Sequence, residues 1–413
     1  MKSILMLVPY ENLYPPMNGG MQRCFHIIHQ LSIYHELTVV TTQIRTDFEK
    51  AIIHYPSIAG IKIYSTKDEP AVKDLFNLLP EKYVHAVRYR WYKKSLISSA
   101  DGLYLQYYPV LSKLLQHNKY DVIILENLAV LNATDLIRRY DRRVKIVYDA
   151  HNVESNLARG AVLKGAINQK RYYHINQTEK NLYKSVNAIF ASSNNDRDDF
   201  LNMNEHLLTA AVVPNGVEVF NGVFDAGVKQ SHPEYILFCG SLGYPANSEG
   251  LQWFYNAVWP VIRNVFPELK LLVVGSGKPP VEMQLLNHEP SIKFSGTVED
   301  VKPWYNKAAI AIVPLLSGSG TRLKILEAMS LGLPVVSTSK GAEGIAYSDG
   351  QDILIADTRE AFAAGIIKLL RNENTRIDIQ QAAIKLINEK YDWNIIGRLM
   401  VDFIEEKLTT NSN

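Results

Sequence analysis

The chain has 413 residues, of which 47% are apolar, and its 44 Lys+Arg against 42 Asp+Glu leave a formal net charge of +2. This length predicts two or three globular domains, and this charge balance gives no indication of nucleic-acid binding. The two cysteines, Cys24 and Cys239, are too few for a disulfide framework or a thiolate metal site. The short apolar start, Met1 to Tyr10, is typical of a first strand rather than a signal peptide. The low cysteine content fits a reducing cytoplasm, and no apolar run is long enough to span a membrane.

Short apolar segments alternate with helical patterns along the first half of the chain, which is typical of βαβ units and a parallel sheet. The expected strands there are Ile4–Val8, Leu37–Thr42, Ile61–Tyr64, Val122–Leu125, Val144–Tyr148 and Ala188–Ser192. Pro214-Asn215-Gly216 is a strong turn signal and marks the predicted domain boundary.

The same alternation restarts after this turn. The expected strands are Tyr235–Cys239, Leu271–Val274, Ile292–Phe294, Ile310–Val313, Val335–Thr338 and Ile353–Ile355. We therefore predict an α/β protein with two Rossmann-like domains, residues 1–213 and 214–390, and a ligand cleft between them at the carboxyl ends of the strands. An amphipathic helix in residues 391–413 is expected at the domain junction, packing back on the first domain.

The segment Ile310 to Thr338 contains the largest group of candidate functional residues. An apolar strand leads into a Gly-Ser loop, residues 317–320, and Thr321 opens a helical pattern. Free backbone N–H groups and the helix dipole favour phosphate at such a place, and Arg322 and Lys324 add two cations. Glu327, three residues beyond Lys324, is a carboxylate suited to two sugar hydroxyls. The alternative is an ordinary strand-loop-helix connection in which Lys324 and Glu327 form a surface pair.

Other expected strand ends also carry candidate residues. Gly19 and Gly20 precede a helix, where glycine permits close approach of a ligand or simply makes a tight turn. His151, in Asp149-Ala-His-Asn152, can donate to a phosphate or sugar oxygen, or it can be structural. Gly240 and Ser241 follow the first strand of the second domain, without P-loop spacing.

Two further features have a structural interpretation as well as a functional one. Asp196 and Asp198 resemble a metal-binding pair, but their place in the first turn of a helix favours capping. Residues 81–96 mix five cations with aromatic side chains and could contact an anionic membrane or a phosphorylated lipid acceptor, or could form a solvated basic helix. No HExxH, GxSxG or clustered His/Cys pattern supports hydrolase chemistry.

Taken as a set, these residues resemble the retaining nucleotide-sugar glycosyltransferases of the two-Rossmann (GT-B) type, family 4, over essentially the whole chain. The motifs that carry the resemblance are Gly19-Gly20, Asp149-Ala-His151-Asn152, Val213-Pro-Asn-Gly216, Gly240-Ser241, the Gly318–Gly332 block, Pro334-Val-Val-Ser337 and Tyr391-Asp-Trp393. The resemblance implies that donor binds mainly to the second domain and acceptor to the first.

The resemblance also implies roles for single residues. Glu327 would hold the ribose hydroxyls, and His151 would face the donor sugar or phosphate. The donor-binding set would further include Gly240, Ser241, Gly318, Ser319, Gly320 and Thr321, while Gly19 and Gly20 would approach the diphosphate or acceptor. The implied substrates are a UDP- or GDP-linked sugar and a saccharide or lipid-linked acceptor of cell-surface polysaccharide or glycolipid assembly. Neither a metal nor another cofactor is implied, and the location is cytoplasmic, peripheral at the inner face of the membrane.

The chain departs from the family pattern at three positions. Ser319 stands where the first Glu of the Glu-x7-Glu pattern is expected, Ser241 replaces an Arg, and Glu249 replaces a Lys. Arg322 and Lys324 are our candidates to supply the missing cations, since charge on a leaving diphosphate must be met by something. The departures keep two alternatives open: a nucleotide-sugar epimerase or hydrolase on the same fold, and a degenerate non-catalytic subunit. A dinucleotide oxidoreductase is disfavoured because no GxGxxG follows the first strand.

Overall fold

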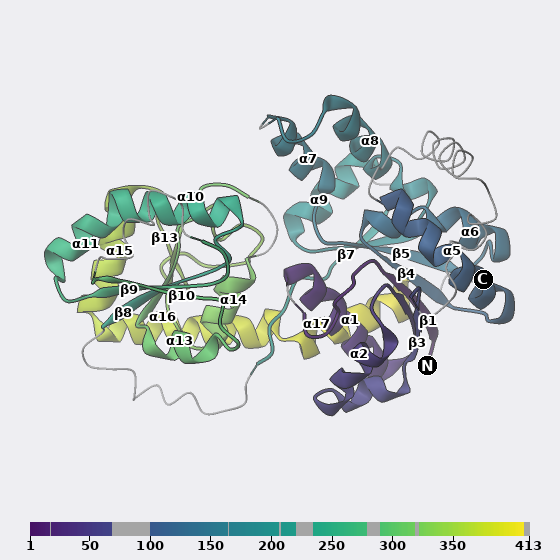
Figure 1. Cartoon of the computed structure of the whole chain (residues 1–413), viewed down its shortest axis with the longest axis horizontal. Helices are drawn as coiled ribbons and strands as arrows, with labels where there is room; N and C mark the ends of the chain where they lie inside the picture. Colours follow the sequence, from purple (N-terminus) through teal and green to yellow (C-terminus); the bar gives the residue numbers. More distant parts are fainter. Residues whose placement is uncertain are drawn as a thin grey trace. The chain divides into compact units, whose positions relative to one another are not determined.

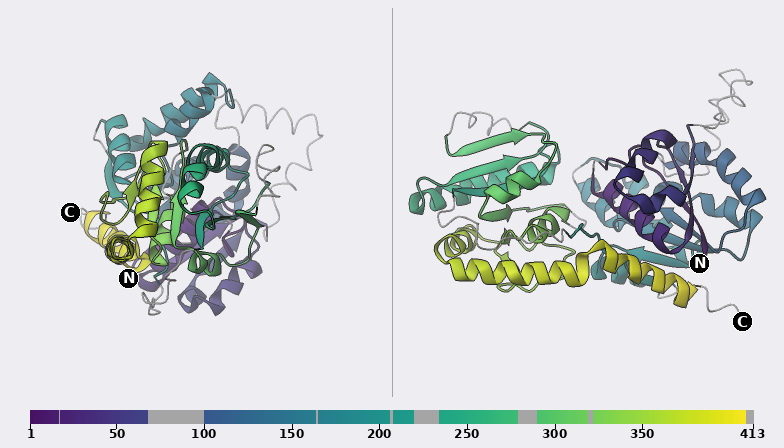
Figure 2. Two further views of the ribbon diagram at one scale, coloured as in Figure 1. Left: turned by 90° about the vertical axis from the view of Figure 1, so that its left-hand side faces the viewer. Right: turned by 90° about the horizontal axis from the view of Figure 1, so that it is seen from below.

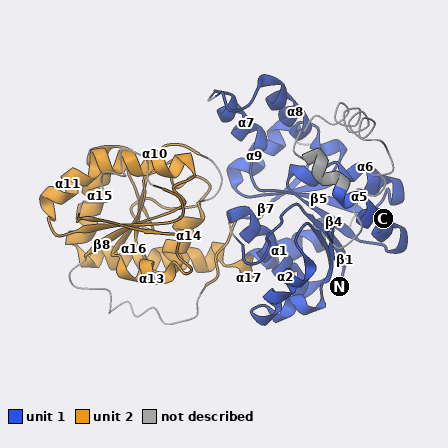
Figure 3. Cartoon of the chain, viewed as in Figure 1, with its two compact units in different colours: residues 1–214, 396–413 blue, residues 215–395 orange. Residues whose placement is uncertain are grey.

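The computed structural model describes residues 1–16, 18–67, 100–163, 165–205, 208–219, 234–278, 290–318 and 322–408. The basic segment 81–96 and the loop residues Ser319, Gly320 and Thr321 lie outside these ranges. The chain forms two compact units (Figure 3): unit 1 comprises Met1–Pro214 and Ile396–Asn413, and unit 2 comprises Asn215–Ile395. The sequence placed these boundaries at 213/214 and 390/391.

Unit 1 is built on a parallel sheet that has seven strands within the described residues, in the order β3-β2-β1-β4-β5-β6-β7 (Figure 1). The strands are β1 (Ser3–Val8), β2 (Glu36–Thr41), β3 (Lys62–Ser65), β4 (Val122–Glu126), β5 (Lys145–Ala150), β6 (Ala188–Ala191) and β7 (Thr209–Val212). Strand β5 runs two residues beyond its predicted end at Tyr148, so Asp149 is part of the strand. Strand β7 was not predicted; it is a half-exposed edge strand with weak patterning.

Helices pack on both faces of this sheet. The main ones are α1 (Gly19–Tyr34), α2 (Arg45–Glu49), α5 (Ala100–His117), α6 (Ala133–Tyr140), α7 (Glu154–Leu163), α8 (Gln169–Glu179), α9 (Asn194–Met203) and α17 (Trp393–Phe403). One face is buried under α5, α6 and α9. On the other face α17 lies against α1, since a Cβ at Gly397 would be 2.4 Å from Gln30 Oε1, and Phe403 contacts Phe190 of β6 with ring centroids 5.6 Å apart.

Unit 2 repeats the architecture with a parallel sheet that has six strands in the described part of the chain, ordered β10-β9-β8-β11-β12-β13. These strands are β8 (Tyr235–Cys239), β9 (Lys270–Val274), β10 (Ile292–Gly296), β11 (Ile310–Val313), β12 (Val335–Ser337) and β13 (Leu354–Ile355). The main helices are α10 (Pro245–Trp253), α11 (Trp259–Val265), α13 (Lys302–Lys307), α14 (Leu323–Ser330), α15 (Arg359–Arg371) and α16 (Glu373–Leu386). Apolar clusters fill both faces of the sheet, which is covered by helices on each side (Figure 2).

Both sheets have the strand order of a doubly wound fold. In unit 1 the order reverses between β1 and β4, and in unit 2 between β8 and β11. The connections that leave these two strand pairs run in opposite directions, which opens a crevice at their carboxyl ends where ligands of such folds bind. Polar residues at these two places are therefore the candidates for a site. Among the described residues, no helix is both long enough and apolar enough to cross a membrane.

Candidate functional site

Lys324 lies at the reversal point of unit 2, in the first turn of α14. Its Nζ donates a hydrogen bond to Asn247 Oδ1 over 2.6 Å and lies 5.2 Å from the ring centroid of Phe238. The Asn247 Nδ2 in turn donates to the carbonyl of Ser241, just after β8, over 2.7 Å. Burial lowers the pKa of Lys324 to about 8, and Arg322 adds to this effect. The ammonium form still predominates at neutral pH, so a cation is held at the end of β8.

Gly240 makes room for this cation. A Cβ at Gly240 would lie 2.5 Å from Lys324 Nζ and 2.9 Å from Asn247 Nδ2, and φ at this residue is +156°. A Cβ at the neighbouring Gly275, after β9, would lie 2.1 Å from the Gly240 carbonyl oxygen. The ends of β8 and β9 therefore need residues without side chains, which leaves the backbone open to close approach by a ligand.

Glu327 lies almost one turn further along α14. Tyr305 Oη donates to its Oε2 over 3.4 Å. Burial raises the pKa of Glu327, although Tyr305 and Lys324 both favour the charged carboxylate. Within the described residues no ion pair joins Lys324 to Glu327, and both side chains are partly buried. The alternative reading of an ordinary surface pair is therefore wrong.

Arg322 occupies the N-cap position of α14, which begins at Leu323 and so starts two residues later than the sequence predicted. Its side chain is 6% exposed, and burial lowers its pKa. It lies beside Gly318, where φ is +99° and a Cβ would be 3.1 Å from Arg322 Nη2 and 3.0 Å from Tyr244 Oη. Arg322 and Lys324 thus both belong to the start of α14, where free backbone N–H groups favour an anion.

The two departures from the family pattern in this part of unit 2 form hydrogen bonds of their own. The Ser241 hydroxyl accepts from Ser276 Oγ over 3.0 Å. Ser317 Oγ donates to Glu249 Oε2 over 2.6 Å, so the carboxylate that replaces the expected Lys is bonded to the loop after β11. Ser241 and Glu249 therefore add no positive charge to the site.

In unit 1, His151 follows β5 directly and lies near the reversal point between β1 and β4. Its Nε2 is 3.0 Å from Glu126 Oε2, at the end of β4, and its Nδ1 is 3.1 Å from Tyr10 Oη, beyond the end of β1. Burial lowers the pKa of His151 to about 4, whereas burial and Asp149 raise the pKa of Glu126 well above its usual range. The imidazole is therefore neutral at pH 7, and both of its nitrogens have polar partners.

A buried ion pair supports this cluster. Arg23 and Asp149 are 1% and 0% exposed, and the guanidinium binds the carboxylate through Nε–Oδ2 at 2.9 Å and Nη2–Oδ1 at 2.5 Å. Arg23 Nη1 also donates to the carbonyl of Val213 over 2.7 Å. Burial by itself would raise the pKa of Asp149, but the Arg23 guanidinium lowers it overall. The pair fixes the end of β5 against α1.

Gly19 and Gly20 are the first two residues of α1, not a loop before it, and Asn18 caps the helix by accepting from the Met21 N–H. A Cβ at Gly20 would lie 2.5 Å from Tyr10 Oη and 3.2 Å from His151 Nδ1. The glycine therefore allows this helix terminus to approach the Tyr10–His151 pair.

The structure thus gathers the predicted residues in two groups, one in each unit. In unit 2 these are Gly240, Ser241, Gly318, Arg322, Lys324 and Glu327, and in unit 1 they are Gly19, Gly20 and His151. The sequence analysis missed Asn247 and Tyr305 in unit 2, and Tyr10, Arg23, Cys24 and Glu126 in unit 1. Asn247 and Tyr305 lie within helices α10 and α13, where no local pattern marks them. Glu126 is the last residue of an apolar strand, and this position could have drawn attention to it.

Known proteins resemble this chain in sequence over parts of its length. Residues 233–372 match the family model for glycosyl transferases group 1. An uncharacterized 44.6 kDa protein in the cps region of Klebsiella pneumoniae is 33% identical over 164 residues, 38% of this chain and 42% of that protein. A phosphatidyl-myo-inositol mannosyltransferase of Mycobacterium leprae is 26% identical over 211 residues, 49% of this chain and 55% of that protein. The chain thus spans about half the length of these curated relatives.

Solved structures resemble the chain over nearly all of its length. Anabaena Alr3699/HepE in complex with UDP and glucose has a TM-score of 0.66 at 14% identity, covering 98% of this chain and 100% of that one. Sucrose-phosphate synthase from Thermosynechococcus elongatus has a TM-score of 0.69 at 14% identity, covering 98% and 99%. These likenesses confirm the predicted GT-B fold. The match to the family model for glycosyl transferases group 1 lies within unit 2.

Proposed function

We propose that the protein transfers a sugar from a UDP- or GDP-linked donor to a hydroxyl of a saccharide or lipid-linked acceptor, with retention at the anomeric carbon and without a divalent metal at the diphosphate. The observation that carries this proposal is the pairing of Lys324 with Asn247 beside Gly240, at the reversal point of a doubly wound sheet. The solved structures of Anabaena Alr3699/HepE with UDP and with UDP-glucose support a nucleotide-sugar donor.

In this proposal unit 2 stabilises the leaving group. When the anomeric bond breaks, negative charge develops on the diphosphate, and groups already in place stabilise it without reorganisation. The Lys324 ammonium, the Arg322 guanidinium and the N–H groups at the start of α14 supply that positive potential. The resemblance assigns Gly240, Ser241 and the loop residues Gly318, Ser319, Gly320 and Thr321 to the same diphosphate; Ser319, Gly320 and Thr321 lie outside the described residues.

Glu327 orients the nucleoside. A carboxylate has enough acceptor sites to bind both ribose hydroxyls, and the hydrogen bond from Tyr305 to its Oε2 keeps one oxygen in a fixed direction. Donation by two hydroxyls would stabilise the carboxylate form and lower a pKa that burial has raised. In this proposal Glu327 therefore holds the ribose beside α14.

Unit 1 supplies His151 and the start of α1. To bind the donor sugar or phosphate, the neutral imidazole of His151 would exchange one of its two present contacts, with Tyr10 or with Glu126. The N–H groups of Gly19 and Gly20 donate hydrogen bonds to the diphosphate or to the acceptor. No side-chain carboxylate is assigned as the base: the departing diphosphate oxygen takes the proton of the acceptor hydroxyl.

Two relatives support the proposed acceptor class. The phosphatidyl-myo-inositol mannosyltransferase acts, by its name, on a lipid-linked acceptor, and the Klebsiella pneumoniae relative comes from the cps region. We place this chain in cell-surface polysaccharide or glycolipid assembly on that support, with residues 81–96 as a candidate contact with anionic lipid.

The test begins with a thermal-shift panel of UDP, GDP, TDP, ADP and NAD on the wild type, with and without added Mg²⁺ or Mn²⁺. A ligand at a hundred times its Kd adds about 2.7 kcal/mol, which moves Tm by several degrees. We expect a metal-independent shift with one nucleoside diphosphate, and a much smaller shift for Glu327→Gln. Glu389→Gln, at an exposed position of unit 2, is the matched control and should behave as wild type.

The responding nucleotide then defines the donor for a transfer assay, and the anomeric configuration of the product is read by NMR. A shift with NAD alone would contradict the proposal, and no shift with any nucleotide would favour the degenerate subunit. Release of free sugar at the full rate without an acceptor would favour the hydrolase or epimerase. An inverted product would disprove retention.

A further inference from the structure

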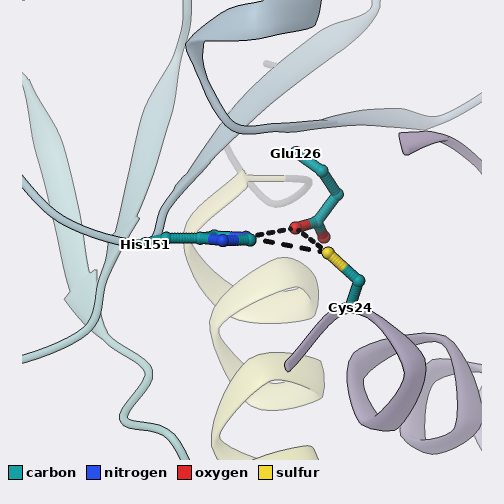
Figure 4. Close-up of side chains that lie close together, drawn as sticks. All are labelled: Cys24, Glu126 and His151. Carbon is teal, nitrogen blue, oxygen red and sulfur yellow. Dashed lines mark hydrogen bonds and ion pairs between the residues drawn. The ribbon is translucent and has the colours of Figure 1, made fainter. Parts of the chain in front are cut away.

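Three side chains from distant parts of unit 1 meet at one point. Cys24 lies in α1, Glu126 ends β4, and His151 follows β5. Cys24 Sγ is 3.1 Å from Glu126 Oε2 and 3.7 Å from His151 Nε2, and this nitrogen is 3.0 Å from the same carboxylate oxygen. Figure 4 shows the three side chains pointing toward one another. Within the described residues this is the one such group of three His, Cys, Asp or Glu side chains.

The spacing of these atoms fits a metal ion. Zinc binds thiolate at about 2.3 Å, imidazole at about 2.0–2.1 Å and carboxylate at about 2.0–2.2 Å, so tetrahedral geometry holds the ligand atoms about 3.4–3.6 Å apart. The three separations here, 3.0, 3.1 and 3.7 Å, lie around that range. A shift of Glu126 Oε2 by roughly half an ångström would bring the two short separations into it, while the Sγ–Nε2 separation of 3.7 Å already lies just above it. The ligand types, one soft sulfur with a nitrogen and an oxygen, suit Zn²⁺ rather than Mg²⁺ or Ca²⁺.

The surroundings of the cluster are consistent with a divalent cation. Cys24 and Glu126 are both 0% exposed. A thiolate and a carboxylate carry two negative charges, which a Zn²⁺ ion would balance, so the loaded cluster with a neutral imidazole would have no net charge. The Asp149 carboxylate neutralises the nearby Arg23 guanidinium, which also donates a hydrogen bond to the Val213 carbonyl. No unbalanced positive charge therefore lies beside the ion.

Neighbouring groups hold the ligands in place. The contact between His151 Nδ1 and Tyr10 Oη directs Nε2 toward Glu126, which is the arrangement that metal-bound histidines usually have. Asn127, directly after Glu126, has φ 67° and ψ 161°, a conformation that is nearly restricted to glycine. Its N–H donates to the Asp149 carbonyl over 3.1 Å, and its side chain accepts from the Ala129 N–H. These hydrogen bonds thus hold the end of β4 in an energetically unfavourable backbone conformation.

We propose that Cys24, Glu126 and His151 form a three-ligand Zn²⁺ site in unit 1. The site shares His151 with the proposed function, since Nε2 would bind the metal instead of a sugar or phosphate oxygen, and it is separate from the diphosphate cations assigned to unit 2. A metal there would lock the imidazole of His151 and join α1 to the ends of β4 and β5.

Cobalt(II) is the probe, because a thiolate ligand gives it a charge-transfer band in the near ultraviolet. The full-length protein is treated with a chelator, dialysed and titrated with Co²⁺ and then with Zn²⁺. We expect the band to saturate at one equivalent of Co²⁺ and to disappear when Zn²⁺ replaces it. Cys239→Ser, which removes the other cysteine, should keep the band, while Cys24→Ala should lose it and weaken Zn²⁺ binding by at least about a hundred-fold.

Glu126→Gln is a second variant that nearly preserves the side-chain shape, in case Cys24→Ala does not fold. It should keep the thiolate band but bind Co²⁺ at least about ten-fold more weakly. The inference is overturned if the wild type shows no thiolate band, or if the band follows Cys239 instead of Cys24. The UDP and GDP thermal shifts, measured on the same samples, separate this outcome from failure of the proposed function: a protein that binds nucleotide but no Co²⁺ refutes only the metal site.

Discussion

Lys324 and Asn247 are joined by a 2.6 Å hydrogen bond that ties the first turn of α14 to α10. Because Asn247 also binds the Ser241 carbonyl, the position of the ammonium is set by the backbone that follows β8. The cation is therefore pre-positioned at the reversal point of the sheet rather than carried on a free side chain.

Lys324→Ala is expected to lower kcat by roughly 100- to 1,000-fold, the usual effect of removing one group that stabilises transition-state charge. The affinity for the nucleoside diphosphate should fall as well, because the proposed function places the same ammonium at the bound diphosphate. Steady-state kinetics and thermal shift measure the two effects. Lys385→Ala, at an exposed position of α16, is the control. Unchanged turnover in Lys324→Ala would exclude this lysine as the diphosphate cation.

Gly240→Ala should disturb the same cation by steric means. The new Cβ would lie 2.5 Å from Lys324 Nζ, so the ammonium or the strand end must move, at a stability cost of about 1–3 kcal/mol. Gly60→Ala is the matched control, because a Cβ there meets nothing within 4 Å, and its effect should stay within about 0.5 kcal/mol. Urea unfolding and nucleotide thermal shift are the measurements. Equal stability and equal nucleotide binding in the two variants would show that the close approach is unimportant.

Asp149→Asn is expected to destabilise unit 1 by about 3–5 kcal/mol, because it leaves the buried Arg23 guanidinium without its counter-charge. The pKa of Asp149 is lower in the folded protein than in the unfolded chain. The contribution of Asp149 to the free energy of unfolding is therefore complete above its unfolded-state pKa of about 3.9. It is lost as the pH falls through the lower pKa that Asp149 has in the folded protein. Urea unfolding between neutral and acid pH should show this loss in the wild type and not in the variant. Asp378→Asn, at an exposed position, should change little at either pH.

His26 should make unit 1 less stable in acid. It packs edge-on between Phe25 and Tyr55, and burial, with a smaller effect of His29, lowers its pKa to about 3. The unfolded chain takes up a proton below about pH 6.5, so the free energy of unfolding should fall between pH 6.5 and pH 3 by at most about 1.4 kcal/mol per pH unit. His26→Phe should flatten this slope, and His117→Gln, at an exposed position, should not. A slope that is the same in all three proteins would rule out His26 as its source.

The sequence predicted most strands well because buried parallel strands are continuous apolar runs. Strand β8 has the predicted bounds, Tyr235–Cys239, and all five of its residues are apolar, a continuous run that is typical of a buried strand. Strand β7 was missed because three of its four residues are only partly buried and one is exposed, so the run lacks that pattern. The start of α14 was placed too early because Thr321 is a good capping residue, whereas the structure has Arg322 at the N-cap.

The two groups of candidate residues, one in each unit, differed in how far the sequence could predict them. Lys324 and Glu327 lie on one strand-loop-helix segment, where spacing along the chain already implies proximity. Glu126 and Cys24 are 102 positions apart, and only the order β1-β4-β5 in the sheet brings them together. No local pattern encodes such a meeting. Asn247 was missed for the same reason, since its partner Lys324 is 77 positions away.

Unit 1 is discontinuous along the chain: it is made of residues 1–214 and 396–413, with all of unit 2 between them. During synthesis the sheet of unit 1 emerges first, but the helix that covers Gln30 and Phe190 is made last. That apolar face therefore stays uncovered while about 180 further residues are translated, or roughly 10–35 s at ordinary elongation rates. Unit 2 can therefore finish folding before unit 1 receives its last helix.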